Sequence, residues 1–274
     1  MKKFAICLLL CAFLAATVYG GKLSLKFNGG GTYLLGGDYN KAMDGWRDYE
    51  KSVLGPTETL VDNMKKIGLG VQFGGELLYE LSPSLAAGIE VGFLSASVES
   101  SFSRDWHNYK MTLKPALSAV PLTLNVHYFL PLGAGLKLQA MAGAGAYFFS
   151  LNYEYDIEDI SSPYSGTWKP KSKTVFGAKA GVGLELDLSA NMALTFDVVG
   201  RLAEVDDLTG DWSGIYYGSP RNGTGTIYYY ELDGTYPLLG IFETLTTGGH
   251  NQNVRKAKFS LSGVSALIGF KIKL

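Results

Sequence analysis

The most informative pattern in this chain is a long alternation of apolar positions with positions that carry glycine or a polar residue. From Ile67 to Leu81 the odd-numbered positions are nearly all apolar, and most positions between them hold glycine, glutamine or glutamate. Phe176 to Leu188 repeats the pattern more regularly, with glycine, lysine, glutamate and aspartate in the second row. Because successive side chains of a β-strand point to opposite faces, each segment is predicted to be a strand with one apolar face.

The same period extends over most of the chain and predicts eight strands. The rows slip near Pro121 and near Gly263, where we expect a β-bulge or the edge of a membrane zone, and the parity also changes after Phe148. The predicted strands cover residues 22–35, 67–81, 85–93, 109–130, 136–153, 176–188, 192–201 and 254–274.

The connections between these strands alternate strictly between short and long. The short ones lie around Pro83, Gly133 and Ser189. Outer-membrane barrels have short periplasmic turns, long external loops and both termini on the periplasmic side. The predicted fold is therefore all-β, an eight-stranded antiparallel transmembrane up-and-down β-barrel, with domain bounds 21–274. The long external connections are 36–66, 100–108, 155–173 and 208–253.

A soluble eight-stranded cup such as a lipocalin, with the apolar row inside, is the alternative. The glycines favour the membrane barrel, because most of them share a face with the charges, as expected for a crowded lumen. The aromatic residues of the apolar face also sort into two belts, as bilayer interfaces select. Phe27, Tyr79, Tyr128, Phe196 and Phe270 lie toward the short turns, and Tyr33, Phe93, Phe148 and Phe176 lie toward the long loops.

The start of the chain has the features of an export signal. Two lysines precede an apolar stretch from Phe4 to Ala16, and Val18 and Gly20 are small residues of the kind that signal peptidase accepts. Residues 1–20 are therefore predicted to be a cleaved signal peptide. A lipoprotein signal ending at Cys11 is the alternative, but the apolar run continues past that residue.

Removal of this segment changes the composition that matters for function. Cys7 and Cys11 leave with it, so we expect no disulfide and no cysteine metal site. The remaining 22 basic and 25 acidic residues give a net charge of about −3, too small an imbalance to indicate nucleic-acid binding. We expect no cofactor.

Three segments resemble known outer-membrane proteins. Residues 120–129 and 142–148 resemble consecutive strands of small outer-membrane barrels of the outer-membrane protein W and opacity-protein type. Residues 269–274 resemble the C-terminal signal of outer-membrane barrels, although the chain ends in Leu274 rather than an aromatic residue and has Leu267 where a polar residue is usual. The resemblance implies the outer membrane of a Gram-negative-type bacterium, contact with lipid and lipopolysaccharide, and assembly by periplasmic chaperones and the barrel-assembly machinery.

The inward row of the predicted barrel carries charges of both signs. Because an unpaired charge in a confined lumen is costly, we expect a paired polar network that plugs the barrel. A narrow conduit for small solutes or small apolar molecules is the alternative. The predicted lumenal residues are Lys26, Glu76, Glu80, Glu90, His127, Lys137, Gln139, Lys179, Glu185, Asp187, Asp197, Arg201 and Lys271.

Few residues indicate catalysis or metal binding. Among the three histidines, only His107 has candidate partners, in Ser103 and Asp105. His127 is expected to form hydrogen bonds in the lumen, and His250 has no evident partner. We therefore expect no enzyme, no catalytic residue and no metal site. A Ca²⁺ site on the acidic rim is a weaker hypothesis and would involve Glu204, Asp206, Asp207 and Asp211.

The external loops carry the remaining functional candidates. Tyrosine-rich exposed loops suit recognition of proteins or glycans. For most of these rings, however, we expect residues 224–232 to extend the barrel as a hairpin above the membrane, with the rings packing on each other. A helix-like spacing over 39–54 indicates a segment that caps the lumen. The predicted role is structural or surface interaction, with a narrow pore as the alternative and a lipid A-modifying enzyme third. The loop candidates are Trp212, Tyr216, Tyr217, Tyr228, Tyr229 and Tyr230.

Overall fold

The computed structural model describes residues 22–274, apart from 56–57, 105–108 and 160–162. The predicted signal peptide lies outside the described residues, as do His107 and its candidate partner Asp105. None of the helices among the described residues is long and apolar enough to cross a bilayer.

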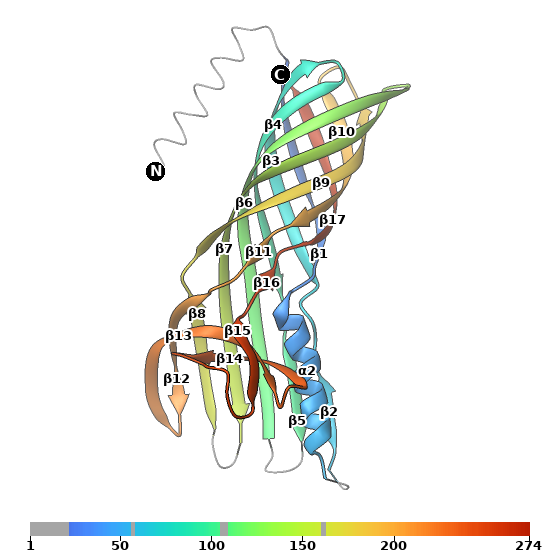
Figure 1. Ribbon diagram of the computed structural model, residues 1–274. Coiled ribbons are helices and arrows are strands. Elements are labelled where there is room, and N and C mark those ends of the chain that lie inside the picture. Colours follow the sequence, from blue (N-terminus) through green and yellow to red (C-terminus); the bar gives the residue numbers. More distant parts are fainter. Residues whose placement is uncertain (1–21, 56–57, 105–108, 160–162) are drawn as a thin grey trace.

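Eight antiparallel strands of the described chain close into a ring (Figure 1). Strands that follow one another around the ring pair side by side, and β1 pairs with β17 to close it, so the ring has no free edge. The ring strands are β1 (Lys22–Leu34), β3 (Leu69–Ser82), β4 (Leu85–Ser97), β6 (Tyr109–Gly133), β7 (Leu136–Glu158), β9 (Lys173–Asp187), β10 (Met192–Leu202) and β17 (Gly263–Lys273).

The prediction of one strand over 254–274 is wrong. The segment instead forms β15 (Asn251–Lys256), β16 (Phe259–Ser260) and the ring strand β17. Phe259 and Leu261 are fully buried in an apolar core, and the Leu261 amide donates to the Ala203 carbonyl at 2.9 Å. The chain therefore breaks before Gly263 because these side chains turn into that core.

The apolar row of the ring strands faces outward, as the sequence predicted. Val182 is 58% exposed, Phe196 50% and Ile268 61%, whereas Asp197 and Glu185 beside them are buried. Apolar side chains lie exposed on all eight ring strands. The interior of the ring holds the glycine-and-charge row.

Near Pro121 we expected a β-bulge or the edge of a membrane zone. No bulge occurs there, and the slip near Pro121 and the parity change after Phe148 both mark a change of surroundings along continuous strands. β6 keeps one register with β7 from Lys110 to Pro131, and Pro121 pairs opposite Tyr147. Odd-numbered residues of both strands face inward throughout. At the paired positions Val120 and Phe148 the outer face changes from apolar to polar, and the inner face changes from polar to apolar. The surroundings change while the strands continue.

Beyond that level the chain forms a second layer of structure, which we call the distal module (Figure 1). It extends the ring sheet from the ends of β6 and β7, and its core contains fully buried side chains such as Phe149 and Trp168. Most of the three longest predicted loops is therefore folded. The module comprises residues 109–119 of β6, 149–158 of β7, α2 (Asp38–Val53), β2 (Leu60–Asn63), β5 (Ser100–Arg104), β8 (Tyr164–Pro170), β11 (Glu204–Val205), β12 (Thr209–Tyr216), β13 (Ser219–Leu232), β14 (Tyr236–Phe242), β15 and β16.

The helix expected over 39–54 is present as α2, but it packs on the distal module instead of capping the lumen. It contacts β14 and β2, which are the two ends of the sheet order, so it spans the open side of the distal sheet. Tyr39 and Met43 are fully buried there. Gly45 permits the close approach, since a Cβ at that position would overlap the Pro237 carbonyl.

Candidate functional site

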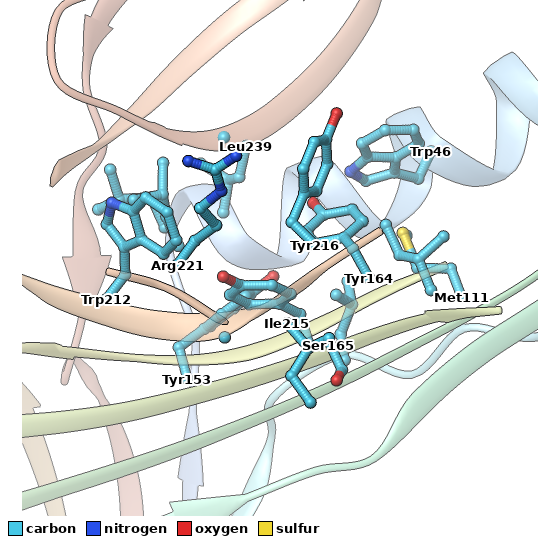
Figure 2. A pocket seen from close by; sticks show the side chains of 17 residues that line it. Trp46, Met111, Tyr153, Tyr164, Ser165, Trp212, Ile215, Tyr216, Arg221 and Leu239 are labelled. Carbon is cyan, nitrogen blue, oxygen red and sulfur yellow. The ribbon is translucent and has the colours of Figure 1, made fainter. Parts of the chain in front are cut away.

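The distal module contains a partly open cavity of about 660 Å³ (Figure 2). Its walls come from α2, β6, β7, β8, β12, β13 and β14, so segments far apart in the sequence meet around it. Most lining side chains are apolar or aromatic, and Arg221 is the one charged residue among the described residues that line it. This volume lies within the range of sites that hold small molecules.

Two glycines in neighbouring strands permit close packing beside the cavity. Tyr155 pairs with Gly166, Gly166 with Gly214, and Gly214 with Arg221, which places the four residues in one row across the sheet. A Cβ on Gly166 would lie 2.5 Å from the Tyr155 hydroxyl, and one on Gly214 would overlap the Ser165 carbonyl. Gly166 therefore leaves room for the Tyr155 ring, and Gly214 permits the close approach of the Ser165 carbonyl.

Aromatic rows border the row of Gly166 and Gly214 on both sides. On one side Tyr164 packs against Tyr155 and Tyr216, with ring centroids 5.3 and 5.8 Å apart. On the other side the register aligns Tyr153, Trp168 and Trp212. The facing wall is aliphatic or aromatic and consists of Trp46, Met111, Leu113, Leu239 and Ile241.

The polar groups of the cavity are hydrogen-bond donors. The hydroxyls of Tyr153, Tyr155 and Tyr164 have no hydrogen-bond partner among the described residues. Burial raises the pKa of all three, and together with nearby Tyr155 it raises the pKa of Tyr164 to about 12. These phenols therefore stay protonated at neutral pH. Arg221 is exposed at the rim, and no ion pair is formed by it within the described chain.

The predicted lumenal residues lie inside the ring, where most of them form buried ion pairs. Lys26 Nζ lies 2.8 Å from Asp197 Oδ2, and both side chains are 3% exposed. Lys271 Nζ lies 2.7 Å from Glu185 Oε2, and Lys137 Nζ lies 3.0 Å from Glu185 Oε1. The charges thus neutralise one another at the level nearer the short turns.

A second lumenal group surrounds His127. Its Nε2 lies 2.8 Å from Glu76 Oε1, and its Nδ1 lies 2.9 Å from Gln139 Nε2. Asn125 Nδ2 donates to Glu76 and also to Glu90, at 3.0 Å for the latter. The remaining lumenal candidates are Lys179, which pairs with Glu90; Asp187, which lies 3.2 Å from Lys137; Arg201, which donates to Gln72, Thr32 and the Leu261 carbonyl; and Glu80, which is half-buried.

Lumenal glycines make room for these side chains. A Cβ on Gly143 would overlap the Asn125 side-chain oxygen, and one on Gly183 would overlap an Asp197 carboxylate oxygen. The inward polar network and the glycine row are therefore two parts of one packing arrangement.

The other candidate residues do not assemble into a site. His250 Nδ1 lies 2.5 Å from Asp233 Oδ1 on the surface. Within the described residues no group of three or more potential metal ligands occurs. The residues of the acidic rim take separate partners instead: Asp206 with Lys173, Asp207 with Lys256, and Asp211 with Thr224, while Glu204 is exposed in β11.

The six aromatic loop candidates divide between the cavity and the packing of the module. Trp212 and Tyr216 line the cavity, and Tyr217 packs on Tyr216 with centroids 4.5 Å apart. Tyr229 lies under the Arg255 guanidinium, and Tyr230 packs on Phe242. Tyr228 is half-buried in β13.

Among the described residues that line the cavity, only Trp212 and Tyr216 are predicted loop candidates, so sequence reasoning missed Arg221 and the residues from β6, β7, β8 and β14. A signal for β7 was present, because Tyr153, Tyr155 and Ile157 alternate with Glu154, Asp156 and Glu158. That alternation indicates a strand with one buried apolar face beyond the ring. No comparable pattern marks Arg221.

No protein-family model matches the chain, and no curated protein matches it either. The fold is similar to a major outer membrane protein from Thermus thermophilus, at 15% identity and a TM-score of 0.45, covering 93% of this chain and 100% of the other. It is also similar to the outer membrane protease OmpT from Escherichia coli, at 8% identity and a TM-score of 0.44, covering 93% and 96%. A third similarity, to the outer membrane protein OprG from Pseudomonas aeruginosa, has 12% identity and a TM-score of 0.36, covering 92% and 95%. None of these similarities assigns a substrate to this chain.

Proposed function

We propose that this protein is a surface-binding protein of a bacterial outer membrane. The ring is its membrane anchor, and the distal module is external and binds a small apolar or amphipathic molecule. The observation that carries the binding role is the cavity of about 660 Å³ with aromatic and aliphatic walls.

The exposed apolar belt supports the membrane anchor. Soluble monomers rarely expose a continuous apolar surface of this extent, whereas barrels place such a band against lipid. From Phe176 to Leu188 the chain would rise roughly 30 Å along the barrel axis, at ~3.3 Å per residue and a tilt of ~40°. That height matches the hydrocarbon layer. The belt would contact outer-membrane lipid and lipopolysaccharide.

The lumenal network supports an anchor over the alternative of a narrow pore. Its charged side chains are paired across the ring, and apolar groups also fill the interior, including the clusters Leu78–Ala86–Phe129 and Met141–Val199–Leu267. Opening a path would separate buried ion pairs, which is strongly unfavourable. The proposal includes no catalytic step.

Energy transfer from tryptophan tests the binding role. The protein is inserted into lipid nanodiscs and titrated with 2-naphthylmethanol, a neutral probe that accepts energy from Trp46 and Trp212 at the cavity wall. We expect saturable transfer that Ile241→Phe, which adds a ring at the wall, weakens. Ile268→Phe on the apolar belt is the matched control and should bind like the wild type.

Transfer no greater than in empty nanodiscs would refute the binding role. The anchor role has a separate test, which is single-channel recording in planar bilayers. We expect no channel openings. Steady channel openings would refute the plugged barrel and favour the pore.

A further inference from the structure

We infer that the cavity selects ligands with a carboxylate head and an apolar body, and that Arg221 holds the head at the rim. This inference deepens the proposed function and rests on it. The proposed function requires only that the cavity binds a small molecule. The inference adds the charge of that molecule and the residue that binds the charged group.

The position of Arg221 is set by strand register. It pairs opposite Gly214, whose neighbours on the same face of β12 are Trp212 and Tyr216. Since Gly214 has no side chain, the arginine extends between the two rings, and Figure 2 shows it there among the lining residues. The guanidinium therefore belongs to the cavity wall.

The charge balance around the cavity favours an anion. Among the described residues, no aspartate or glutamate lines the cavity and Arg221 forms no ion pair. The hydroxyl of Tyr155 lies over Gly166 in the same row and is protonated at neutral pH. It can therefore serve as a second hydrogen-bond donor to a ligand carboxylate. A carboxylate can accept from both kinds of donor, and hydrogen bonds to an ionised acceptor are the stronger ones.

The polarity of the cavity fixes the orientation of the ligand. Arg221 is exposed, so a carboxylate beside it keeps part of its hydration. Met111, Leu113 and Leu239 also line the cavity but are buried, so an anionic head placed among them would lose its hydration without a partner. The head therefore lies at the rim and the apolar body lies inward.

Aromatic walls also suit cations, which sit over the faces of tryptophan and tyrosine rings. Arg221 opposes that alternative by like-charge repulsion. A cationic probe of the same shape therefore tests the assignment directly.

The experiment compares three probes of one size in nanodiscs at neutral pH: 2-naphthoate, 2-naphthylmethanol and 2-naphthylmethylammonium. Affinities come from energy transfer after subtraction of empty nanodiscs. We expect 2-naphthoate to bind about tenfold more tightly than the alcohol, equivalent to about 1.4 kcal/mol, and the ammonium probe to bind most weakly. Added salt should weaken binding of the carboxylate and leave that of the alcohol nearly constant.

Two charge-removing variants locate the effect. Arg221→Gln should abolish the preference for 2-naphthoate over the alcohol. Lys169→Gln removes the same charge from β8, outside the cavity, and should keep the preference. Equal affinities of the wild type for carboxylate and alcohol, a preference for the ammonium probe, or a preference that survives Arg221→Gln would overturn the inference. In each of these cases binding of the alcohol still supports the proposed function, whereas binding of none of the probes overturns both.

Discussion

Breaking the ion pair between Lys26 and Asp197 should destabilise the ring more than removing the whole pair. The two charges lie 2.8 Å apart and both side chains are 3% exposed, so water screens them little. Coulomb's law gives an attraction of about 6 kcal/mol at an effective dielectric constant of about 20, offset by the cost of removing both ions from water. Removal of one partner leaves the other charge buried alone, which costs about 3–5 kcal/mol.

The test is a double-mutant cycle with Asp197→Asn, Lys26→Met and the combined variant. Urea unfolding in lipid vesicles, followed by far-UV circular dichroism, reports on the loss of all strands, including those of the ring. Fluorescence of Trp46, Trp168 and Trp212 follows the distal module separately and serves as an internal control. We expect each single variant to lose about 3–5 kcal/mol and the double variant to lose less than either.

Additive single effects would show that the two side chains act independently, and would refute the paired network as the source of stability. A double variant less stable than both singles would have the same consequence. Either result would also weaken the case for a plugged lumen.

Three further perturbations address the belt, the helix and the pH dependence. Val182→Arg, in the middle of the apolar belt, should destabilise the protein in lipid by ~2–4 kcal/mol, and unchanged urea midpoints would count against a lipid-facing residue. Gly45→Val should push α2 from β14, because its side chain would meet the Pro237 carbonyl; faster proteolysis of residues 36–66 would report this, and wild-type resistance would contradict the packing. Burial raises the pKa of Asp38, whereas hydrogen bonds from Arg255 and from the Lys258 amide, together with the arginine charge, lower it. The net pKa lies below the usual value of 3.8. The folded state therefore favours the carboxylate, so its stabilisation is complete above pH 3.8 and is lost as the pH falls below that value. Asp38→Asn should flatten tryptophan-monitored stability in this range, and an unaltered acid profile would rule out the contribution.

The ring was predictable because it depends on a local property of the sequence. Alternation with period two determines which residues share a face, and Phe176 to Leu188 shows it without the structure. The short turns around Pro83, Gly133 and Ser189 followed from the same reading. Seven of the eight expected strands correspond to ring strands in the described chain, with ends that differ by a few residues.

The distal module was not predictable from the same rule. At Val120 and Phe148 the strands pass from one environment to another, and the row that faces inward becomes apolar. An alternation with period two shows only that the two faces of a strand differ. It does not show which face contacts lipid, solvent or a protein core. The slip near Pro121 therefore predicted either a bulge or the edge of a membrane zone, and the segments that connect the long strands were predicted to be loops.

The sequence by itself determined the alternation, the strand order that follows from short and long connections, and the placement of charge with glycine on one face. Only the tertiary structure decided that Gly166 and Gly214 lie side by side, with Tyr155 at one end of their row and Arg221 at the other. These four residues come from four strands, and their meeting depends on the register of three strand pairs. Register is set by the packing of the whole sheet, so no local pattern specifies the cavity that it creates.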